Sequence, residues 1–281
     1  MTGVQTCALP ILEVRGGQFQ ITASHQAFLD WQSFNVGAGE TARFIQPSAT
    51  SIVWNRVHDP SPSRIDGRIE ANGVVVLMNQ AGFHFGSGAF VEAAGLVVST
   101  APVTPVESGG GLFWQFSGPP PQAGIVNYGQ INVGRGGSLF LIGEKVENHG
   151  TLRAPEGEVG LLAGKEVLLS ARPDGRGLSA TVELPSGSVA NSGGIFADAG
   201  SIALKARVVN QDGVIQANAV RERHGVIELV ASEHVGLGDQ SVTSARGETD
   251  ASSDGGRVEV KSGGGYSDAP TARVDVSGGS R

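Results

Sequence analysis

Cysteine, clustered basic residues and long apolar runs are scarce in this sequence, and each absence excludes a class of protein. The single cysteine, Cys7, lies in the opening stretch, so residues 13–281 hold no disulfide and no thiolate metal site. No apolar run approaches the ~18 residues of a membrane-spanning helix, and we expect no membrane span. The 20 basic residues, against 27 acidic ones, form no cluster that would neutralise phosphates, and we expect no nucleic-acid partner.

Glycine, in contrast, is abundant. It supplies 43 of 281 residues, while hydrophobic residues make up 40% and charged residues 17% of the chain. Average proteins contain about 7% glycine and about 25% charged residues. The glycines follow no strict third-residue period, which excludes a collagen helix. Enough apolar residues for a core, with a surface of small polar residues, indicates an all-β protein.

The opening segment, residues 1–12, shares no pattern with the rest of the chain. It has no Lys or Arg ahead of its short apolar run from Ala8 to Leu12, so it does not have the composition of a signal peptide. We interpret it as a non-native, adapter-like segment that stands where the export signal is missing. Residues 13–281 are then one domain, truncated at its C-terminus.

An Asn-x-Gly phrase that opens an alternating strand recurs from residue 127 onward. Successive copies are spaced by 21, 43 and 19 residues, which gives a period near 21 with one copy replaced. A second phrase, a glycine before alternating apolar residues, interleaves with it, as at residues 137–141. Two short strands per period bury one face each. The copies begin at Asn127, Asn148, Asn191 and Asn210, the last with one residue inserted before its glycine.

A period of ~20 residues built from short strands is typical of a solenoid. Leucine-rich repeats need a different spacing and usually a helical return, and no helical periodicity is present. We predict a right-handed parallel β-helix, with a cap and irregular first coils at residues 13–126 and repeat coils at 127–281. The four asparagines should occupy equivalent corners, where Asn and Gly tolerate positive φ and Asn side chains can bond along the stack. One buried column should contain Ile131, Leu152, Ile195 and Ile215.

Two segments interrupt the period and are predicted to be extra-helical excursions. Residues 166–190 replace the missing copy and have a turn cluster on each side of an alternating stretch, which indicates a hairpin or a strand on the outer face. Residues 101–124 are rich in Pro and Gly around an apolar knot that should fold back onto the coil. The knot contains Leu112, Phe113, Trp114 and Phe116.

The N-terminal third carries distinctive words in a fixed order instead of repeats. They are the segment from Asp30 to Ser48, then Asn55-Arg56-Val57, residues 65–73, residues 76–86, and Gly95 to Thr100. This combination closely resembles the haemagglutination-activity, or two-partner-secretion, domain of filamentous-haemagglutinin-like exoproteins. The resemblance covers nearly everything from about residue 13.

That resemblance implies a right-handed β-helix with an N-terminal cap. It also implies recognition in the Gram-negative periplasm by the POTRA domains of a TpsB-type outer-membrane β-barrel transporter. The exoprotein would be secreted or displayed on the cell surface. Its long C-terminal remainder, absent from this sequence, would carry adhesion, haemolysis or toxicity and any binding to host or bacterial surface glycans.

The resemblance also nominates residues for recognition by the transporter. Asn55, Arg56 and Val57 match the family's N-R-V, and residues 79–83 match its N-P-N-G-I/V with Asn79 and Gly82 kept. Gln80 and Ala81 depart from that second motif, and no clear copy of the family's N-P-N-L is present. Both motifs also have a structural interpretation. Asn79 to Gly82 are favoured as a tight turn between apolar strands 74–78 and 83–85, and Asn55 and Arg56 are alternatively caps of a strand end.

Other functional classes are tested by the same residues. Parallel β-helices also include polysaccharide lyases and hydrolases, which need carboxylates that converge on one face. The acidic residues at turns and outward positions show no shared column, and the six histidines never pair at metal-ligand spacing. We therefore expect no enzyme, cofactor or metal site, with a carbohydrate-active enzyme and a free-standing carbohydrate-binding adhesin as the alternatives. The acidic set is Asp66, Glu70, Glu92, Glu144, Glu147, Glu156 and Glu158.

Aromatic residues near the N-terminus have a structural explanation. An open end of a β-helix exposes unpaired edges that must be covered. Trp31, Phe34 and Phe44 are therefore expected to form the apolar plug of the cap.

Overall fold

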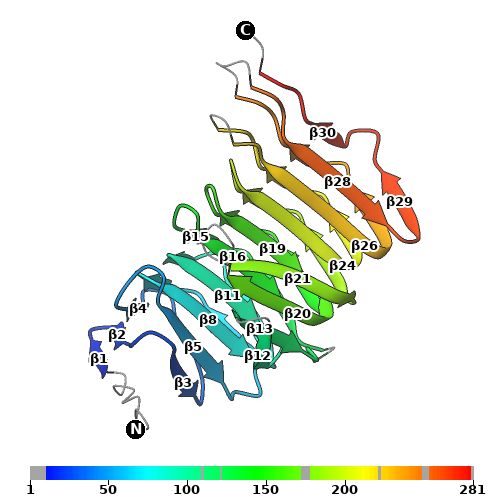
Figure 1. The fold of residues 1–281 in the computed structure, drawn as a ribbon. Coiled ribbons are helices and arrows are strands. Elements are labelled where there is room, and N and C mark those ends of the chain that lie inside the picture. Colours follow the sequence, from blue (N-terminus) through cyan, green and yellow to red (C-terminus); the bar gives the residue numbers. More distant parts are fainter. Residues whose placement is uncertain are drawn as a thin grey trace.

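The chain is a parallel β-helix whose coils stack from the N-terminal to the C-terminal end (Figure 1). The computed structural model describes residues 11–108, 111–120, 122–171, 178–220, 223–248 and 253–279. Within these ranges the regular elements are strands, and no helix is long and apolar enough to cross a membrane. Each coil passes through three faces, called here face 1, face 2 and face 3. The predicted fold class is confirmed.

Face 1 is an 11-stranded sheet that is parallel throughout except for the pairing of its first two strands. Its strands are β1 (Ile11–Arg15), β2 (Gln18–Thr22), β4 (Thr41–Ile45), β7 (Arg68–Ala71), β10 (Phe90–Ala93), β15 (Gln130–Val133), β18 (Thr151–Arg153), β23 (Gly194–Phe196), β25 (Val214–Gln216), β27 (Val242–Ser244) and β30 (Arg273–Asp275).

Faces 2 and 3 join into one 15-stranded sheet because two long strands, β24 (Ser201–Gln211) and β26 (Val226–Leu237), run through both. Face 2 otherwise consists of β3 (Ala27–Trp31), β5 (Ile52–Val57), β8 (Val74–Asn79), β11 (Gly95–Ser99), β16 (Ser138–Ile142), β19 (Glu158–Leu162) and β28 (Arg257–Ser262). Face 3 otherwise consists of β6 (Ser63–Ile65), β9 (Gly82–Phe85), β14 (Gly124–Asn127), β17 (Lys145–Asn148), β22 (Ser188–Asn191) and β29 (Gly265–Asp268).

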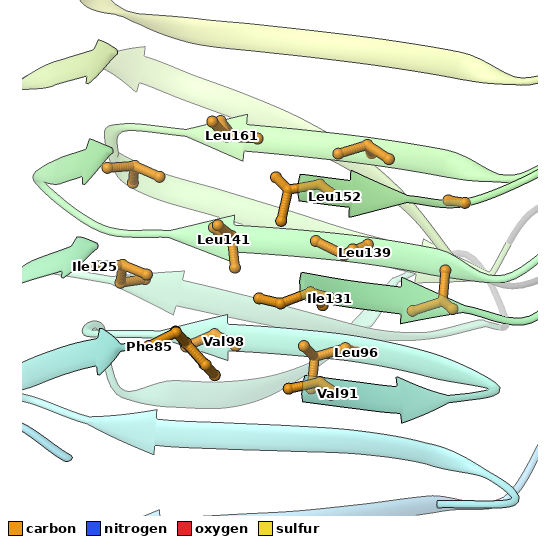
Figure 2. Packing of buried hydrophobic residues seen from close by; sticks show 14 of the residues in the cluster. Phe85, Val91, Leu96, Val98, Ile125, Ile131, Leu139, Leu141, Leu152 and Leu161 are labelled. Atoms are coloured by element: carbon orange, nitrogen blue, oxygen red, sulfur yellow. The ribbon is translucent and has the colours of Figure 1, made fainter. Parts of the chain in front are cut away.

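Inward-pointing side chains form columns, one layer per coil, that fill the interior (Figure 2). On face 1, Ile131 pairs in register with Leu152, Leu152 with Ile195 and Ile195 with Ile215, and all four are fully buried. The predicted buried column and its parallel pairing are therefore confirmed. These residues point inward because successive side chains of a strand alternate between its two faces.

Three of the four predicted asparagines occupy equivalent corners, at the end of face 3. Asn127 Nδ2 donates to Asn148 Oδ1 at 2.8 Å, and Asn148 Nδ2 donates to Asn191 Oδ1 at 2.7 Å. The next position belongs to Gln211, whose Oε1 accepts from Asn191 Nδ2 at 2.8 Å. The prediction for Asn210 is wrong: the residue inserted before Gly213 shifts it by one along the strand, which turns its side chain outward.

The glycines that follow these asparagines are required for a reason other than the one predicted. Gly129, Gly150, Gly193 and Gly213 do not have positive φ. Instead, a Cβ at Gly150 would lie 2.1 Å from the carbonyl oxygen of Gly129, and the same clash would recur at the two later positions. Successive coils approach so closely at this corner that a side chain has no room.

The N-terminal end is closed by a hairpin of β1 and β2 and by a cluster of aromatic rings. Trp31 packs edge-on against Phe34 with ring centroids 5.4 Å apart, and Phe34 lies 6.4 Å from Phe44. Phe44 is fully buried and Trp31 partly so, as expected for the plug. Strand β1 begins at Ile11, inside the segment 1–12 that the sequence set apart, while residues 1–10 lie outside the described residues.

The two predicted excursions both leave the helix at the corner between faces 2 and 3. They form the hairpins β12 (Val103–Ser108) with β13 (Gly111–Ser117), and β20 (Gly164–Ala171) with β21 (Leu178–Pro185). Strands β13 and β20 also pair with each other, so the hairpins combine into one four-stranded antiparallel sheet, called here the outer sheet. Figure 1 shows it lying against face 2.

A second apolar core fills the space between the outer sheet and face 2. Outward-pointing residues of face 2, such as Val97 and Phe140, meet Phe116 from the outer sheet, and all three are fully buried. Trp114 is partly buried against this cluster, whereas the side chains of Leu112 and Phe113 lie outside the described residues. The apolar knot therefore folds back onto the coil, as predicted.

Candidate functional site

The two sequence motifs that are candidates for transporter recognition lie side by side at one corner of the β-helix. Strand β5, which carries Asn55, Arg56 and Val57, is the parallel neighbour of β8 one coil later, and Val57 is the register partner of Asn79. Both strands end at the corner between faces 2 and 3. The helical repeat thus brings together two motifs that are about one coil apart in sequence.

Asn55 points into the helix and is completely buried, between Leu29 and Leu77 of the adjacent coils. Its Oδ1 accepts a hydrogen bond from Trp31 Nε1 at 3.0 Å, and its Nδ2 donates to the carbonyl oxygen of Val76 at 3.1 Å. The alternative prediction of a strand-end cap is wrong, because strand alternation directs this side chain to the interior. In the folded domain Asn55 fixes the plug residue Trp31.

Asn79 forms the predicted tight turn. Its Oδ1 accepts from the Ala81 N–H at 2.8 Å, and its Nδ2 donates to Ser61 O at 3.1 Å and to Ser63 Oγ at 3.0 Å. Gly82 follows with φ of 114°, and a Cβ there would lie 2.5 Å from the carbonyl oxygen of Gly124. This geometry closes the corner and ties it to the previous coil.

Arg56 is the candidate that faces solvent, while Val57, Asn79, Gly82 and Asn55 are buried. Its guanidinium carbon lies 4.5 Å from the centre of the Phe28 ring, a cation–π contact. Its Nε is 3.3 Å from Asp30 Oδ1, which is also 2.8 Å from His58 Nε2.

A cleft of about 830 Å³ opens beside these residues. Phe28, Trp54, Arg56 and Met78 on face 2 border it together with Trp114 of the outer sheet and Gln80 of the Asn79 turn. It lies where the outer sheet stops short of the first coils. Sequence reasoning missed this cleft, although Ile52 and Trp54, apolar at outward positions of a strand, signalled that face 2 is covered in part.

The acidic residues do not form a metal site in the part of the chain that the structure describes. No group of three His, Cys, Asp or Glu there could hold a metal ion. The prediction of no shared column is wrong for Glu70 and Glu92, which are register partners on face 1 because one coil separates them. Arg43 Nη2 lies 2.7 Å from Glu70 Oε2, and Arg68 is 3.6 Å from the other oxygen of the same carboxylate.

Comparison with known proteins decides the family. The family model of the TPS secretion domain matches residues 11–243. The chain belongs to this family. The crystal structure of the HMW1 secretion domain from Haemophilus influenzae superposes on this secretion domain with a TM-score of 0.83 at 27% identity, covering 97% of this chain and 72% of that one. The filamentous hemagglutinin secretion domain shares the fold, with a TM-score of 0.55 at 15% identity over 96% of this chain and 98% of that one.

A curated relative is much longer than the secretion domain. The heme/hemopexin-binding protein of Haemophilus influenzae is 29% identical over 219 residues, which are 73% of this chain and 24% of that protein. A second heme/hemopexin-binding protein from the same species is 38% identical over 77 residues, 27% of this chain and 8% of its own length. The chain therefore spans about a quarter of the length of the first relative.

Proposed function

We propose that this secretion domain directs a longer exoprotein of a Gram-negative bacterium through a TpsB-type outer-membrane transporter to the cell surface or the medium. The match to the TPS secretion domain over residues 11–243 is the observation that carries the proposal. The POTRA domains of the transporter are the proposed periplasmic partner. Any adhesive, toxic or glycan-binding activity of the exoprotein belongs to segments outside this domain.

Recognition takes place, in this proposal, before the early coils close. Four of the candidates, Asn55, Val57, Asn79 and Gly82, are buried in the folded domain. The transporter therefore contacts them only before this part of the chain has folded into the β-helix. Arg56 is available before and after folding. The same residues thus have two roles. Before folding they are recognised by the transporter, and after folding they stabilise the N-terminal plug and the corner between faces 2 and 3.

Folding on the far side of the membrane contributes a driving force for export. Each coil that closes removes one layer of apolar side chains from water, and a solenoid gains this free energy coil by coil. The columns of Figure 2 are the surface that is buried in this process. Such folding opposes backward sliding of the chain without any need for ATP.

The proposed function includes no catalysis. The carboxylates that come closest to a shared column, Glu70 and Glu92, lie on face 1, and Glu70 is engaged by Arg43 and Arg68. A paired acid and base would instead require two carboxylates free to exchange protons with a substrate. This arrangement favours a structural ion-pair column over the polysaccharide lyase or hydrolase alternative.

Secretion of matched variants tests the recognition role. Arg56→Ala, Asn55→Ala and Asn79→Ala would be placed in a full-length exoprotein with a signal peptide and co-expressed with its transporter. Asn148→Ala, which removes a buried asparagine far from the site, is the control for lost stability. The secreted fraction is compared with the urea midpoint of each purified domain.

We expect Arg56→Ala to reduce secretion with little change in midpoint, because exposed ion pairs contribute only ~0–1 kcal/mol. Asn55→Ala and Asn79→Ala should reduce secretion more than Asn148→Ala does at equal loss of stability. Secretion that simply follows the midpoint across all four variants would assign these residues to folding alone. Unimpaired secretion by the three site variants would remove the recognition role.

A further inference from the structure

Arg56 acquires two contacts when the first coils stack on each other. Strand alternation puts Phe28 and Asp30 of β3 on the outer surface of face 2, where Asp30 is the register partner of Arg56 on β5. In the folded domain Arg56 Nε lies 3.3 Å from Asp30 Oδ1, and its guanidinium carbon lies 4.5 Å from the centre of the Phe28 ring. Both partners belong to the preceding coil. An extended chain has neither contact, because β3 and β5 are then far apart.

His58, which directly follows β5, holds the carboxylate of Asp30 in this position. Its Nε2 lies 2.8 Å from Asp30 Oδ1, the same oxygen that Arg56 contacts. The Arg56 side chain keeps 51% of its surface exposed, but Phe28 covers one face of the guanidinium and Asp30 pairs with its charge. Solvent still reaches Arg56 after folding, while a partner that binds the guanidinium has to compete with β3.

We propose that Phe28 and Asp30 are the residues that lower the affinity of the transporter for a folded secretion domain relative to an unfolded one. The proposal rests on the proposed function, in which Arg56 belongs to the recognised segment. Before folding, Arg56 offers all of its N–H donors to the transporter. After folding, β3 competes for the guanidinium, and the other candidates are buried.

This difference in affinity would select chains that can be exported. A domain that has folded in the periplasm can no longer pass through the transporter as an extended chain. Weaker binding of the folded domain keeps the transporter free for unfolded chains. The specificity then comes from contacts within the exoprotein itself, made by the coil that precedes the recognised motif.

The same packing of arginine on phenylalanine recurs away from the motifs and supplies matched controls. On face 1 the guanidinium carbon of Arg68 lies 4.4 Å from the centre of the Phe90 ring, and the Glu70 carboxylate contacts both Arg68 and Arg43. Such packing covers an ordinary surface, so the contacts of β3 gain their role from the motif on which they act. Phe90→Ala and Glu70→Gln release arginines in the same way, at a place without a recognition candidate.

Binding of the purified, folded domain to a soluble periplasmic fragment of its transporter tests the proposal. Biolayer interferometry with the fragment immobilised gives the dissociation constant, and domain concentrations up to about 1 mM reveal weak binding. The variants are Asp30→Asn, which keeps the size of the side chain and removes its charge, Phe28→Ala, and each of these combined with Arg56→Ala. Near-UV circular dichroism and the urea midpoint show whether each variant is folded.

We expect Asp30→Asn and Phe28→Ala each to tighten binding up to about fivefold, the factor that an exposed ion pair or cation–π contact contributes. Adding Arg56→Ala should abolish this gain, because the released group is then absent. Phe90→Ala and Glu70→Gln should leave the dissociation constant unchanged.

Partial unfolding would also expose the motifs, so its effect is measured separately. Asn148→Ala removes buried hydrogen bonds far from β3 and leaves the contacts of Arg56 in place, and we expect it not to tighten binding. Should Phe28→Ala prove partly unfolded, Asp30→Asn decides the result, since Asp30 is exposed and its replacement has nearly the same shape.

Three results would overturn the proposal. The first is that Asp30→Asn binds no more tightly than the wild type, and the second is that its gain persists with Arg56→Ala. The third is an equal gain in the face 1 variants or in Asn148→Ala. Secretion of the Arg56→Ala exoprotein separates these failures from that of the proposed function: normal secretion removes the recognition role itself, whereas impaired secretion without a gain in Asp30→Asn overturns only the role of β3.

Discussion

Replacing Asn148 by alanine tests the interior ladder of side-chain amides. Asn148 is fully buried, accepts a hydrogen bond from Asn127 Nδ2 at 2.8 Å and donates one to Asn191 Oδ1 at 2.7 Å. Alanine leaves Asn191 Oδ1 without this donor and Asn127 Nδ2 with only its longer bond to Gly129 O at 3.3 Å. Each buried polar group that loses its partner costs about 1–3 kcal/mol, so we expect a loss of about 2–4 kcal/mol in the free energy of unfolding.

The chain supplies a matched control in Asn210. It stands in the corresponding sequence phrase but is exposed, and Gln211 takes its place in the ladder. Asn210→Ala should therefore change stability by no more than ~0.5 kcal/mol, as is usual for surface substitutions.

The assay is urea denaturation with thermal melting in parallel, where the Asn148→Ala loss corresponds to a melting temperature roughly 4–16 °C lower. Since a repeat protein can unfold in parts, the transition is followed by far-UV circular dichroism and by tryptophan fluorescence, which reports on the N-terminal coils and the outer sheet. Equal effects of the two substitutions, or a cost below about 0.5 kcal/mol for Asn148→Ala, would refute the ladder as a source of stability.

Three other expectations concern the corner, the outer sheet and pH. Gly150→Ala would place a Cβ 2.1 Å from a carbonyl oxygen of the preceding coil and should cost at least ~1–3 kcal/mol, whereas Gly134→Ala, with nothing closer than 3.7 Å, should be tolerated; equal urea midpoints would contradict this. Phe116→Ala should cost about 3–5 kcal/mol, because the side chain is fully buried under the outer sheet, and an unchanged midpoint would show that this core adds no stability. A hydrogen bond from Lys145 lowers the pKa of Glu147 below its usual 4.5, so its contribution is present above pH ~4.5 and is lost as the pH falls through the lowered value; Glu147→Gln should flatten the acid limb of the stability curve, and an unchanged limb would contradict the assignment.

The stacking of coils could be predicted from the sequence because it depends on short-range patterns, namely the alternation of apolar residues within a strand and the recurrence of the Asn-x-Gly motif about once per coil. Alternation placed Ile131 and Leu152 inside, and the recurring Asn-x-Gly phrase placed Asn127 and Asn148 at one corner. The prediction for Asn210 failed because the motif can still be recognised when one residue is inserted, whereas that insertion changes which residue of the strand points inward. What is conserved through the stack is the distance to the glycine, and this assigns the ladder position to Gln211.

The sequence could predict only the motifs of the candidate site and not their arrangement in space. That Asn55 faces inward follows from strand alternation, but its acceptance among apolar neighbours depends on Trp31, which comes from the preceding coil. The cleft depends on the pairing of β13 with β20, two strands about fifty residues apart. An antiparallel pairing at that separation leaves no period in the sequence, so the outer sheet and the cleft at its end emerged only in three dimensions.

The outer sheet changes how cooperatively this solenoid should unfold. In a simple stack, each coil contacts only its neighbours, and stability adds up along one dimension. Here the hairpin β12–β13 leaves the coil that holds β11 and β14, and the hairpin β20–β21 leaves the coil that holds β19 and β22, with one coil between them. Their pairing through β13 and β20 therefore fastens two coils that do not touch. This pairing makes the central coils one unit of hydrogen-exchange protection. The last coil, which consists of β27, β28 and β29 and is followed by β30, lies past the outer sheet and is free to open separately.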